Sequence, residues 1–425
     1  VIRAENLRLF KDILTDYLEN ALSTGVTKNG LERALLNIND LPGISAVSSI
    51  EPGVEEGSSK IVLNVVEDDL VSGSITLDNH GNRYTAKQRN TIKIDFNNPS
   101  KIGDKLSITK TFNAGEKFDF TQFDYEVPVG QSGFKAFASA SRLEFEIGKE
   151  LRTNPVSLGN ADTIEVGVKY PIQRTNNQSV FLKTSIEKKE IYNETTGVLT
   201  NDKTLENAKI GLDFEGKNIF QDSSLTGVSV SGIFGDLDLS KVNSDYLNDQ
   251  KASGPKTHGD FNKVVLDFYH IHKFTDKINF KYYGSLQHAS KNLDSSEKFS
   301  LGGVSGVRAY PSGEASGDEG HKLSFEVQYD LSKPDMDFDL IGTLFYDYGK
   351  IRQYKDSSNI TLTTPNEYSL SGWGVSFDLI ANERVKLNLG WAQAIGDNDG
   401  QSSSGNNSDG RGGSSRAWFQ VVFRF

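Results

Sequence analysis

The last ten residues of the chain, RAWFQVVFRF (416–425), alternate between apolar and polar side chains over most of their length. Alternation with a period of two indicates a β-strand whose two faces meet different surroundings. If this strand lay in water at the edge of a sheet, its exposed hydrophobic side chains would promote aggregation. The stretch therefore favours a strand with one face against an apolar phase, and that face contains Phe419, Val421, Phe423 and Phe425.

The same period of two extends through the chain from about Val71 onward. In DTIEVGVKY (162–170) and INFKYYGSLQH (278–288), one face is apolar and the other contains charged or polar residues. A soluble sandwich would bury the apolar face between two sheets. A membrane barrel would turn it toward lipid and keep the charged face in a wet lumen. The periodicity alone leaves both architectures open.

Strand number and connection length favour the barrel. We count roughly sixteen strand-like segments, and an even number places both chain ends on one side, as in bacterial barrels. Short connections such as NNPSKIGD (97–104) and YPIQRTNNQS (170–179) alternate with long polar ones at 235–260 and 396–415. Short turns at one end and long loops at the other are typical of membrane barrels. The segments lie near residues 75, 88, 107, 121, 137, 165, 184, 211, 229, 266, 283, 326, 344, 374, 389 and 421.

The composition excludes several classes of protein. The 425-residue chain has a mean hydropathy of −0.45 and no apolar run of the ~18–20 residues that a membrane-spanning helix needs. Its 40 glycines, single methionine and absence of cysteine suit many strands and turns. The net charge of −11, without clusters of lysine and arginine, argues against a nucleic-acid partner. Arg3 and Glu5 stand where a signal peptide would be apolar, so we expect a mature or trimmed chain, or a protein that is not exported.

Residues 1–67 have a different pattern. Apolar residues recur at helical spacing from Leu9 to Ala21 and again, after a break at Gly25, from Leu31 to Ile38. Two strand candidates follow, ISAVSSI (44–50) and KIVLNVVE (60–67). The sequence therefore predicts a small accessory unit with the order helix, helix, strand, strand. A first strand would be missing or would lie at the very start.

A glycine-rich loop, FSLGGVSGVRAYPSGEASGDEG (299–320), separates two of the strand candidates. Glycines allow sharp turns and a close approach to a barrel wall. The loop resembles the sixth loop of the haemolysin secretion/activation family, the two-partner secretion transporters (TpsB), in a superfamily of POTRA-bearing barrels. That loop has a Val-Arg-Gly-Tyr/Phe element, with alanine here in place of its glycine. The matching residues are Gly306, Val307, Arg308, Ala309 and Tyr310.

A second motif and further stretches extend the resemblance over nearly the whole chain. The family's Phe-x-Asp-x-Gly strand motif is matched by Phe345, Asp347 and Gly349. Residues 77–106 resemble the family's first hairpin, and residues 31–65 resemble the end of its second POTRA (polypeptide-transport-associated) domain. The family normally begins with a plug helix, a linker and a first POTRA domain, which are not visible in this sequence.

The resemblance implies a mainly β fold. It would be a 16-stranded antiparallel transmembrane β-barrel (68–425) with an N-terminal α+β POTRA domain (1–67) and a lumen-folded loop near 298–321. The terminal residues Phe419, Val421, Phe423 and Phe425 resemble the assembly signal of outer-membrane barrels.

Strand phase places the two motifs on the same side of the wall. If Leu344 and Tyr346 face lipid, Asp347 faces the lumen, where an inward loop could bring Arg308. Arginine and carboxylate can form a bidentate pair, so we predict a lumen latch; otherwise Arg308 is an ordinary solvated residue. The same phase predicts a polar pore lining that includes Lys183, Lys209, Asp213, Lys263, Asp267, Lys281 and Glu326.

The resemblance also implies the function and the partners. The protein would be an outer-membrane pore that exports a large β-helical exoprotein of the TpsA type. The periplasmic POTRA domain would bind the exoprotein's N-terminal secretion domain by strand addition, aided by the helix after Thr27. Other partners would be outer-membrane lipid, lipopolysaccharide and the barrel-assembly machinery. The cargo stays open among a haemolysin, an adhesin, a haem scavenger and a toxin of contact-dependent growth inhibition.

Other functions find less support in the residues. An insertase of the same superfamily would have several POTRA domains, a passive porin none, and a soluble adhesin would need no detergent. We expect no enzyme, cofactor or metal site. GLDFEGKN (211–218) has Asn218 where a phosphate loop needs Ser or Thr. His270 and His272 have no third ligand nearby, nothing places the carboxylates of Asp213 and Glu326 together, and GDNDGQSSSGNNSDGRGG (396–413) lacks a calcium-site spacing.

Overall fold

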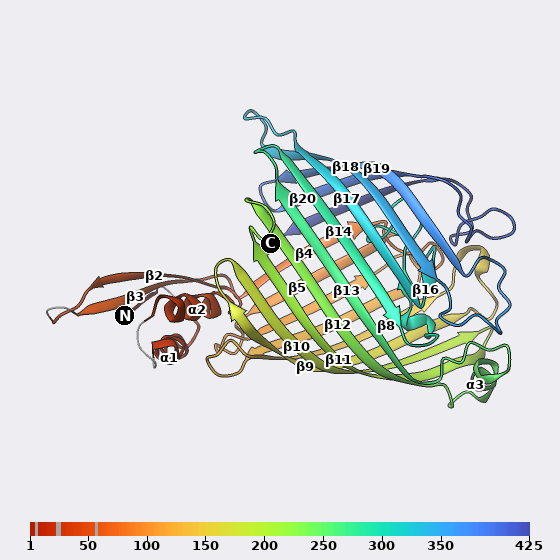
Figure 1. Ribbon diagram of the computed structural model, residues 1–425, viewed down its shortest axis with the longest axis horizontal. Helices are drawn as coiled ribbons and strands as arrows, with labels where there is room; N and C mark the ends of the chain where they lie inside the picture. Colours follow the sequence, from red (N-terminus) through yellow and green to blue (C-terminus); the bar gives the residue numbers. More distant parts are fainter. Residues whose placement is uncertain (5–6, 23–26, 56–57) are drawn as a thin grey trace.

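The computed structural model describes residues 1–4, 7–22, 27–55 and 58–425. A small α/β unit lies beyond one end of a large barrel, and helix α3 (Asn243–Gln250) lies at the other end (Figure 1). Within the described ranges, no helix is both long and apolar enough to span a membrane. The break predicted at Gly25 falls outside the described residues.

The N-terminal unit (residues 1–67) has two helices against a three-stranded sheet. Its strand order is β1-β3-β2, with β1 parallel and β2 antiparallel to the central β3. Leu14, Ile38 and Leu63 are fully buried between the helices and the sheet. The first strand, which the sequence left open, lies at the very start. The elements are β1 (Ile2–Ala4), α1 (Lys11–Leu22), α2 (Lys28–Asn39), β2 (Ile44–Pro52) and β3 (Ser59–Glu67).

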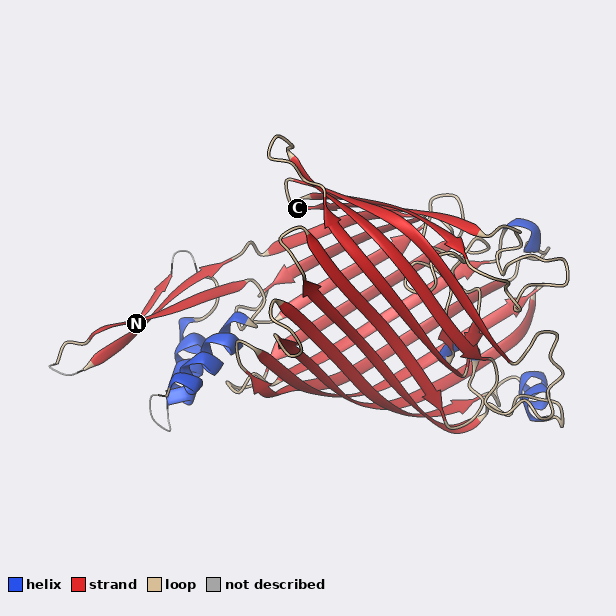
Figure 2. Cartoon of the chain, turned by 45° about the horizontal axis from the view of Figure 1, so that its top comes forward, coloured by secondary structure: helices blue, strands red, loops and turns tan. Residues whose placement is uncertain are grey.

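The remaining chain forms a closed antiparallel barrel of 16 strands, as predicted. The last strand pairs with the first, so the ring has no open edge (Figure 2). The strands are β4 (Val71–Asp78), β5 (Arg89–Asn97), β6 (Lys105–Phe112), β7 (Phe118–Pro128), β8 (Lys135–Glu146), β9 (Leu158–Arg174), β10 (Gln178–Thr195), β11 (Val198–Lys217), β12 (Ser224–Asp238), β13 (Gly259–Lys273), β14 (Ile278–Ala289), β17 (Glu319–Asp330), β18 (Phe338–Arg352), β19 (Glu367–Ala381), β20 (Val385–Ala394) and β21 (Ser415–Arg424).

Connection lengths alternate around the barrel. Turns such as 98–104 and 175–177 lie at the end next to the N-terminal unit, and loops such as 239–258 and 395–414 lie at the other end (Figure 1). Two predicted connections were too long. Strands β12 and β13 extend into the predicted loop 235–260, and β9 and β10 take up most of 170–179. In both predicted connections, the backbone groups still form hydrogen bonds with the neighbouring strand, so the strands are longer than the side-chain pattern indicates.

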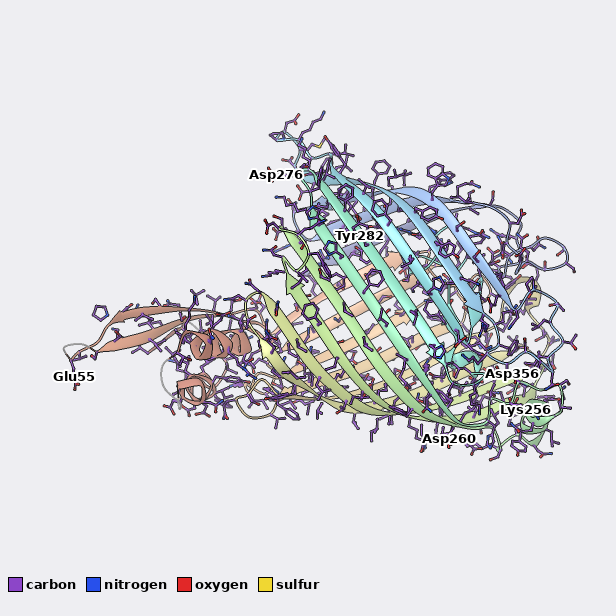
Figure 3. All side chains as sticks on the ribbon, viewed as in Figure 1. Glu55, Lys256, Asp260, Asp276, Tyr282 and Asp356 are labelled. Carbon is purple, nitrogen blue, oxygen red and sulfur yellow. The ribbon has the colours of Figure 1, made fainter. Side chains whose placement is uncertain are left out.

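The outer face of the barrel is apolar and aromatic. Ile186, Leu212 and Val264 are exposed on outward positions of β10, β11 and β13, and Figure 3 places Tyr282 on this face. Phe325 packs against Tyr282, with ring centroids 5.1 Å apart. Exposed apolar side chains around a closed wall are what a lipid-facing band requires.

A charge on the outer face should destabilise the barrel. Leu212 is 47% exposed and pairs with Leu182 and Val230 on the adjacent strands. We expect Leu212→Arg to lower the free energy of unfolding by ~2–4 kcal/mol in phospholipid vesicles, because the guanidinium must enter hydrocarbon. Urea unfolding followed by tryptophan fluorescence measures the change.

Ser231 is the matched control, because its alternation places it on the lumen side of β12. Ser231→Arg should leave the free energy of unfolding nearly unchanged. Equal losses for Leu212→Arg and Ser231→Arg would show that the apolar face does not meet lipid.

The N-terminal unit contacts the short turns of the barrel. Asp40, at the end of α2, accepts two hydrogen bonds from the Arg174 guanidinium, at 2.7 and 2.9 Å. The Lys135 ammonium donates to the Asp40 carbonyl at 2.9 Å, and Arg33 donates to the Pro171 carbonyl at 3.0 Å. These contacts place the unit at the mouth of the barrel.

Candidate functional site

The connection between β14 and β17, residues 290–318, folds into the barrel and is called the lumen loop below. Its short strands β15 (Phe299–Ser300) and β16 (Ser316–Gly317) pair with each other at its base. The apolar side chains of its tip are buried and pack against the inner faces of β18, β19 and β20. The buried tip residues are Leu301, Val307, Ala309, Tyr310 and Ala315.

Glycines permit this close packing. A Cβ on Gly306 would lie 1.7 Å from the Leu301 carbonyl oxygen, so no side chain fits there. On the barrel wall, a Cβ on Gly372 would lie 2.6 Å from the Ala309 Cβ. A Cβ on Gly349, in the strand motif, would lie 2.5 Å from the Leu301 side chain. Gly306 thus lets the loop turn tightly on itself, and the two wall glycines let loop side chains approach the wall closely.

Arg308 makes the contact that the two motifs predict. Its Nε and Nη2 donate to the two carboxylate oxygens of Asp347 at 2.8 and 2.7 Å, and its backbone N–H donates to the same carboxylate at 3.0 Å. Its Cζ lies 3.4 Å from the centroid of the Phe345 ring, a cation–π contact. All three residues of this arrangement come from the predicted motifs.

Additional partners complete the site around Arg308. Nη1 donates to Glu326 at 2.7 Å, and Nη2 donates to Ser324 Oγ at 2.8 Å. Ser324 in turn donates to Asp347 at 2.8 Å, and Trp418 Nε1 donates to the Arg308 carbonyl at 2.7 Å. The predicted set did not contain Ser324 or Trp418. Only their lumen-facing positions in the strand alternation could have indicated them.

The electrostatics of the site favour a charged guanidinium. Burial by itself would lower the pKa of Arg308, but hydrogen bonds and charge from Asp347, together with the charge of Glu326, raise it above its ordinary value. The Asp347 side chain is only 1% exposed. A buried carboxylate of this kind depends on its cationic partner.

The predicted pore-lining residues occupy lumen-facing positions, but two predictions need correction. Glu326 binds Arg308, and Lys263 is buried under the lumen loop, where it contacts Glu297 at 2.8 Å. The inward loop covers this part of the wall, which alternation cannot reveal.

The other residues predicted to line the pore lie on the lumen-facing side of the wall, and their role in the pore stays a prediction. Lys183 lies over the Phe137 ring at 4.6 Å, Lys209 binds Glu187 at 2.6 Å, and Asp213 accepts a hydrogen bond from Ser229 at 2.6 Å. The register places Asp267 and Lys281 on the same side as these residues.

The carboxyl-terminal strand closes the barrel. Phe419, Val421 and Phe423 lie on the outward register of β21, and Phe423 pairs with Ile75 of β4. Phe425 and Gly73 exchange two backbone hydrogen bonds of 2.9 and 3.1 Å. The role of these residues as an assembly signal stays a prediction.

The two histidines, His270 and His272, lie among aromatic side chains. His270 contacts Thr226 Oγ1 at 2.9 Å, and its ring lies 5.9 Å from those of Phe220 and Tyr282. His272 contacts the Phe274 ring. Over the described part of the chain, no group of three or more His, Cys, Asp or Glu could hold a metal ion.

Comparison with known proteins gives consistent matches. Residues 57–379 match the family model "Haemolysin secretion/activation protein ShlB/FhaC/HecB". The heme/hemopexin transporter protein HuxB of Haemophilus influenzae (strain 86-028NP) is 26% identical over 401 residues, which is 93% of this chain and 70% of HuxB. The outer membrane transporter CdiB of Dickeya dadantii is 24% identical over 305 residues, which is 68% of this chain and 51% of CdiB.

Solved structures share the fold. CdiB from Escherichia coli superimposes with a TM-score of 0.80 at 18% identity, over 100% of this chain and 76% of CdiB. BamA from Haemophilus ducreyi, lacking POTRA domains 1–3, has a TM-score of 0.61 at 10% identity, over 100% of this chain and 84% of BamA. The family model covers most of the chain. The chain therefore belongs to the ShlB/FhaC/HecB haemolysin secretion/activation family, the two-partner secretion transporters of the bacterial outer membrane.

Proposed function

We propose that this transporter captures one large exoprotein in the periplasm and passes it, unfolded, through the barrel lumen to the cell surface. The main support is the combination of a polar lumen with an α/β unit held at its short-turn end by Asp40 and Arg174. The proteins that it resembles are transporters rather than enzymes, and we infer no catalytic role. A passive porin would not need the α/β unit.

We also propose that residues 1–67 are a POTRA domain, the second of the family, and that residues 68–425 are the translocating barrel. The two helices and the sheet order β1-β3-β2 support this assignment. Arg308 and Asp347 would then form the latch that holds the lumen loop in its working position. HuxB matches over more of this chain than CdiB does, so we favour a cargo of the heme- or hemopexin-binding class.

The exoprotein would bind by adding a strand to the free edge of β2. Strand β2 pairs with β3 on one side only. The Asn39 side chain forms hydrogen bonds with both backbone groups of Ala46. It accepts one from the Ala46 N–H at 2.6 Å and donates one to the Ala46 C=O at 3.0 Å. The backbone N–H and C=O groups of successive residues point to opposite edges of a strand. Those of Ser48 and Ile50 therefore point to the same free edge of β2 as those of Ala46. The accessible part of the edge therefore begins at Ser48.

Substitution at this edge should block capture. We expect Ser48→Pro to lower secretion at least about tenfold, because proline removes the edge N–H that a cargo strand would bind. The measurement is the amount of partner exoprotein in the medium when both proteins are expressed in cells that lack the native pair.

Two variants make the result specific. Ser48→Ala keeps the N–H and should secrete normally. Ser49→Pro removes an N–H that points to β3 and should unfold the N-terminal unit, which proteolysis would detect. Normal secretion by Ser48→Pro in a folded unit would rule out cargo addition at β2.

A further inference from the structure

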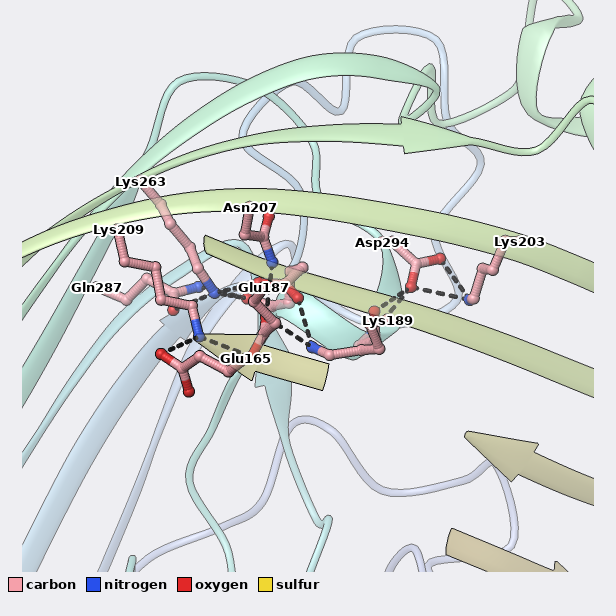
Figure 4. Close-up of polar contacts among 11 residues, drawn as sticks. Glu165, Glu187, Lys189, Lys203, Asn207, Lys209, Lys263, Gln287 and Asp294 are labelled. Atoms are coloured by element: carbon pink, nitrogen blue, oxygen red, sulfur yellow. Dashed lines mark hydrogen bonds and ion pairs between the residues drawn. The ribbon is translucent and has the colours of Figure 1, made fainter. Parts of the chain in front are cut away.

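The lumen loop has a second set of charged contacts, in its segment before Arg308. A short turn at residues 294–297 lies against the lumen face of β10, β11 and β13 (Figure 4). The Lys203 ammonium binds both oxygens of Asp294, at 2.8 and 2.7 Å. Glu297 binds Lys189 and Lys263, each at 2.8 Å. We call these five residues the clasp.

The clasp is buried and supported by apolar packing. The side chains of Lys203 and Glu297 are only 5% and 6% exposed. Leu293, directly before the turn, is buried in a cluster with Leu205 and Phe261. Lys263 also donates to the Glu297 carbonyl at 2.9 Å. The turn is therefore fixed to the wall by charge, backbone and apolar contacts together.

The clasp carboxylates are ionised at neutral pH. Burial alone would raise the pKa of Glu297, but the charges of Lys263 and Lys189 outweigh burial and lower it. Burial likewise opposes ionisation of Asp294, and Lys203 lowers its pKa. Both acids thus attract the lysines as full charges.

The two anchors of the loop lie on different parts of the wall. The Arg308 anchor engages β17, β18 and β21, through Glu326, Asp347 and Trp418. The clasp engages β10, β11 and β13. In the barrel order, β12 lies between β11 and β13, and β14 separates β13 from β17. A single loop is therefore held to two separate arcs of the barrel wall.

The two anchors differ in chemistry. Arg308 binds Asp347 through a rigid two-pronged fork and stacks on Phe345, which fixes its geometry. The clasp relies on lysines, whose compact charges sit on flexible stems and can exchange partners with water or with other carboxylates. Glu187, which binds Lys209 at 2.6 Å and lies 3.9 Å from Lys189, is such a neighbour. The clasp is thus the less rigid of the two anchors.

We propose that the clasp is the gate contact of the lumen loop: the turn at Asp294 and Glu297 leaves the wall when cargo passes, while Arg308 stays bound to Asp347. This inference rests on the proposed export function. Opening uncovers Lys189, Lys203 and Lys263 without their loop acids, so the open lumen becomes more positive at this level.

Channel recordings test the gate without any cargo. The double variant Asp294→Asn/Glu297→Gln keeps the shape of the turn and removes its charge. In planar bilayers we expect its open time to rise by about tenfold, the change in an equilibrium that the loss of ~1.4 kcal/mol produces, with a shift toward anion selectivity. Asp276→Asn is the control, because it removes an exposed pair with Lys273 in a short turn. Unchanged open time and selectivity in the double variant would overturn the proposal.

A reversible lock tests the gate during secretion. The chain has no cysteine, so Lys203→Cys/Asp294→Cys can be joined by a cleavable bismaleimide. We expect the joined protein to stop secreting and the cleaved protein to resume. Lys273→Cys/Asp276→Cys, joined in the same way, should secrete throughout. Normal secretion by the locked clasp would overturn the proposal, whereas absence of secretion by the unaltered protein would count against the export function itself.

Discussion

Arg308→Ala abolishes secretion of the partner exoprotein, and the barrel still reaches the outer membrane: this is the largest effect that we expect from a single substitution. Removing the guanidinium leaves the nearly inaccessible Asp347 and the adjacent Glu326 as carboxylates without their cation. Breaking a buried pair in this way costs ~3–5 kcal/mol. The loop tip should leave the wall, while the strand pairing of the closed barrel is unaffected. Exoprotein in the medium and transporter in the membrane fraction are measured in parallel.

Two matched variants separate the latch from a general effect of losing an arginine. Arg142 makes a similar two-pronged pair with Asp162, at 2.7 and 2.8 Å, but on an exposed part of the wall. Arg142→Ala should secrete normally, because exposed pairs contribute little to stability. Arg308→Lys should restore part of the secretion, since it keeps the charge and loses the fork. If Arg308→Ala secretes as well as the unaltered protein, the latch has no role in export.

Deletion of residues 1–67 should also abolish secretion, and it should leave a conducting pore. The barrel begins at Val71 and closes on itself through β4 and β21, so its backbone pairing does not need the N-terminal unit. The deletion removes the proposed cargo-binding edge of β2 and the contact between Asp40 and Arg174. Secretion assays and planar-bilayer recordings on the same protein measure the two properties separately.

The two assays also define what would contradict this prediction. Continued secretion would mean that the cargo finds the barrel without the unit. A silent bilayer would mean that the unit is needed to form or open the pore. Arg3→Ala, which removes an exposed pair with Glu51 inside the unit, serves as the control and should leave both readings unchanged.

Strand alternation accounts for most of what the sequence could predict about the fold. Each side chain on a strand faces opposite to its neighbours, so a period of two separates the outer face from the lumen before any contact is known. Leu212 and Asp213, adjacent in sequence, indeed lie on opposite faces. The same rule did not predict where β12 ends and β13 begins, because polar residues continue the strand pairing beyond the apolar band.

Of the candidate site, only the residues that belong to short sequence motifs could be predicted. Arg308, Phe345 and Asp347 belong to two recognisable elements, and alternation placed the latter pair correctly. Ser324 and Trp418 belong to no motif, and Glu326 was expected to line an open path. Their contact with Arg308 depends on where the loop tip comes to rest inside the barrel.

The order of apolar and polar residues by itself determined strands with one apolar and one charged face and an α/β unit before them, because these patterns act locally along each strand and helix. Only the closed tertiary structure decided which distant charges meet. Asp294 reaches Lys203 across 91 residues of chain because the ring of strands and the inward path of one loop bring them together. Such contacts depend on barrel circumference and loop course, and neither of these is a property of any local stretch of sequence.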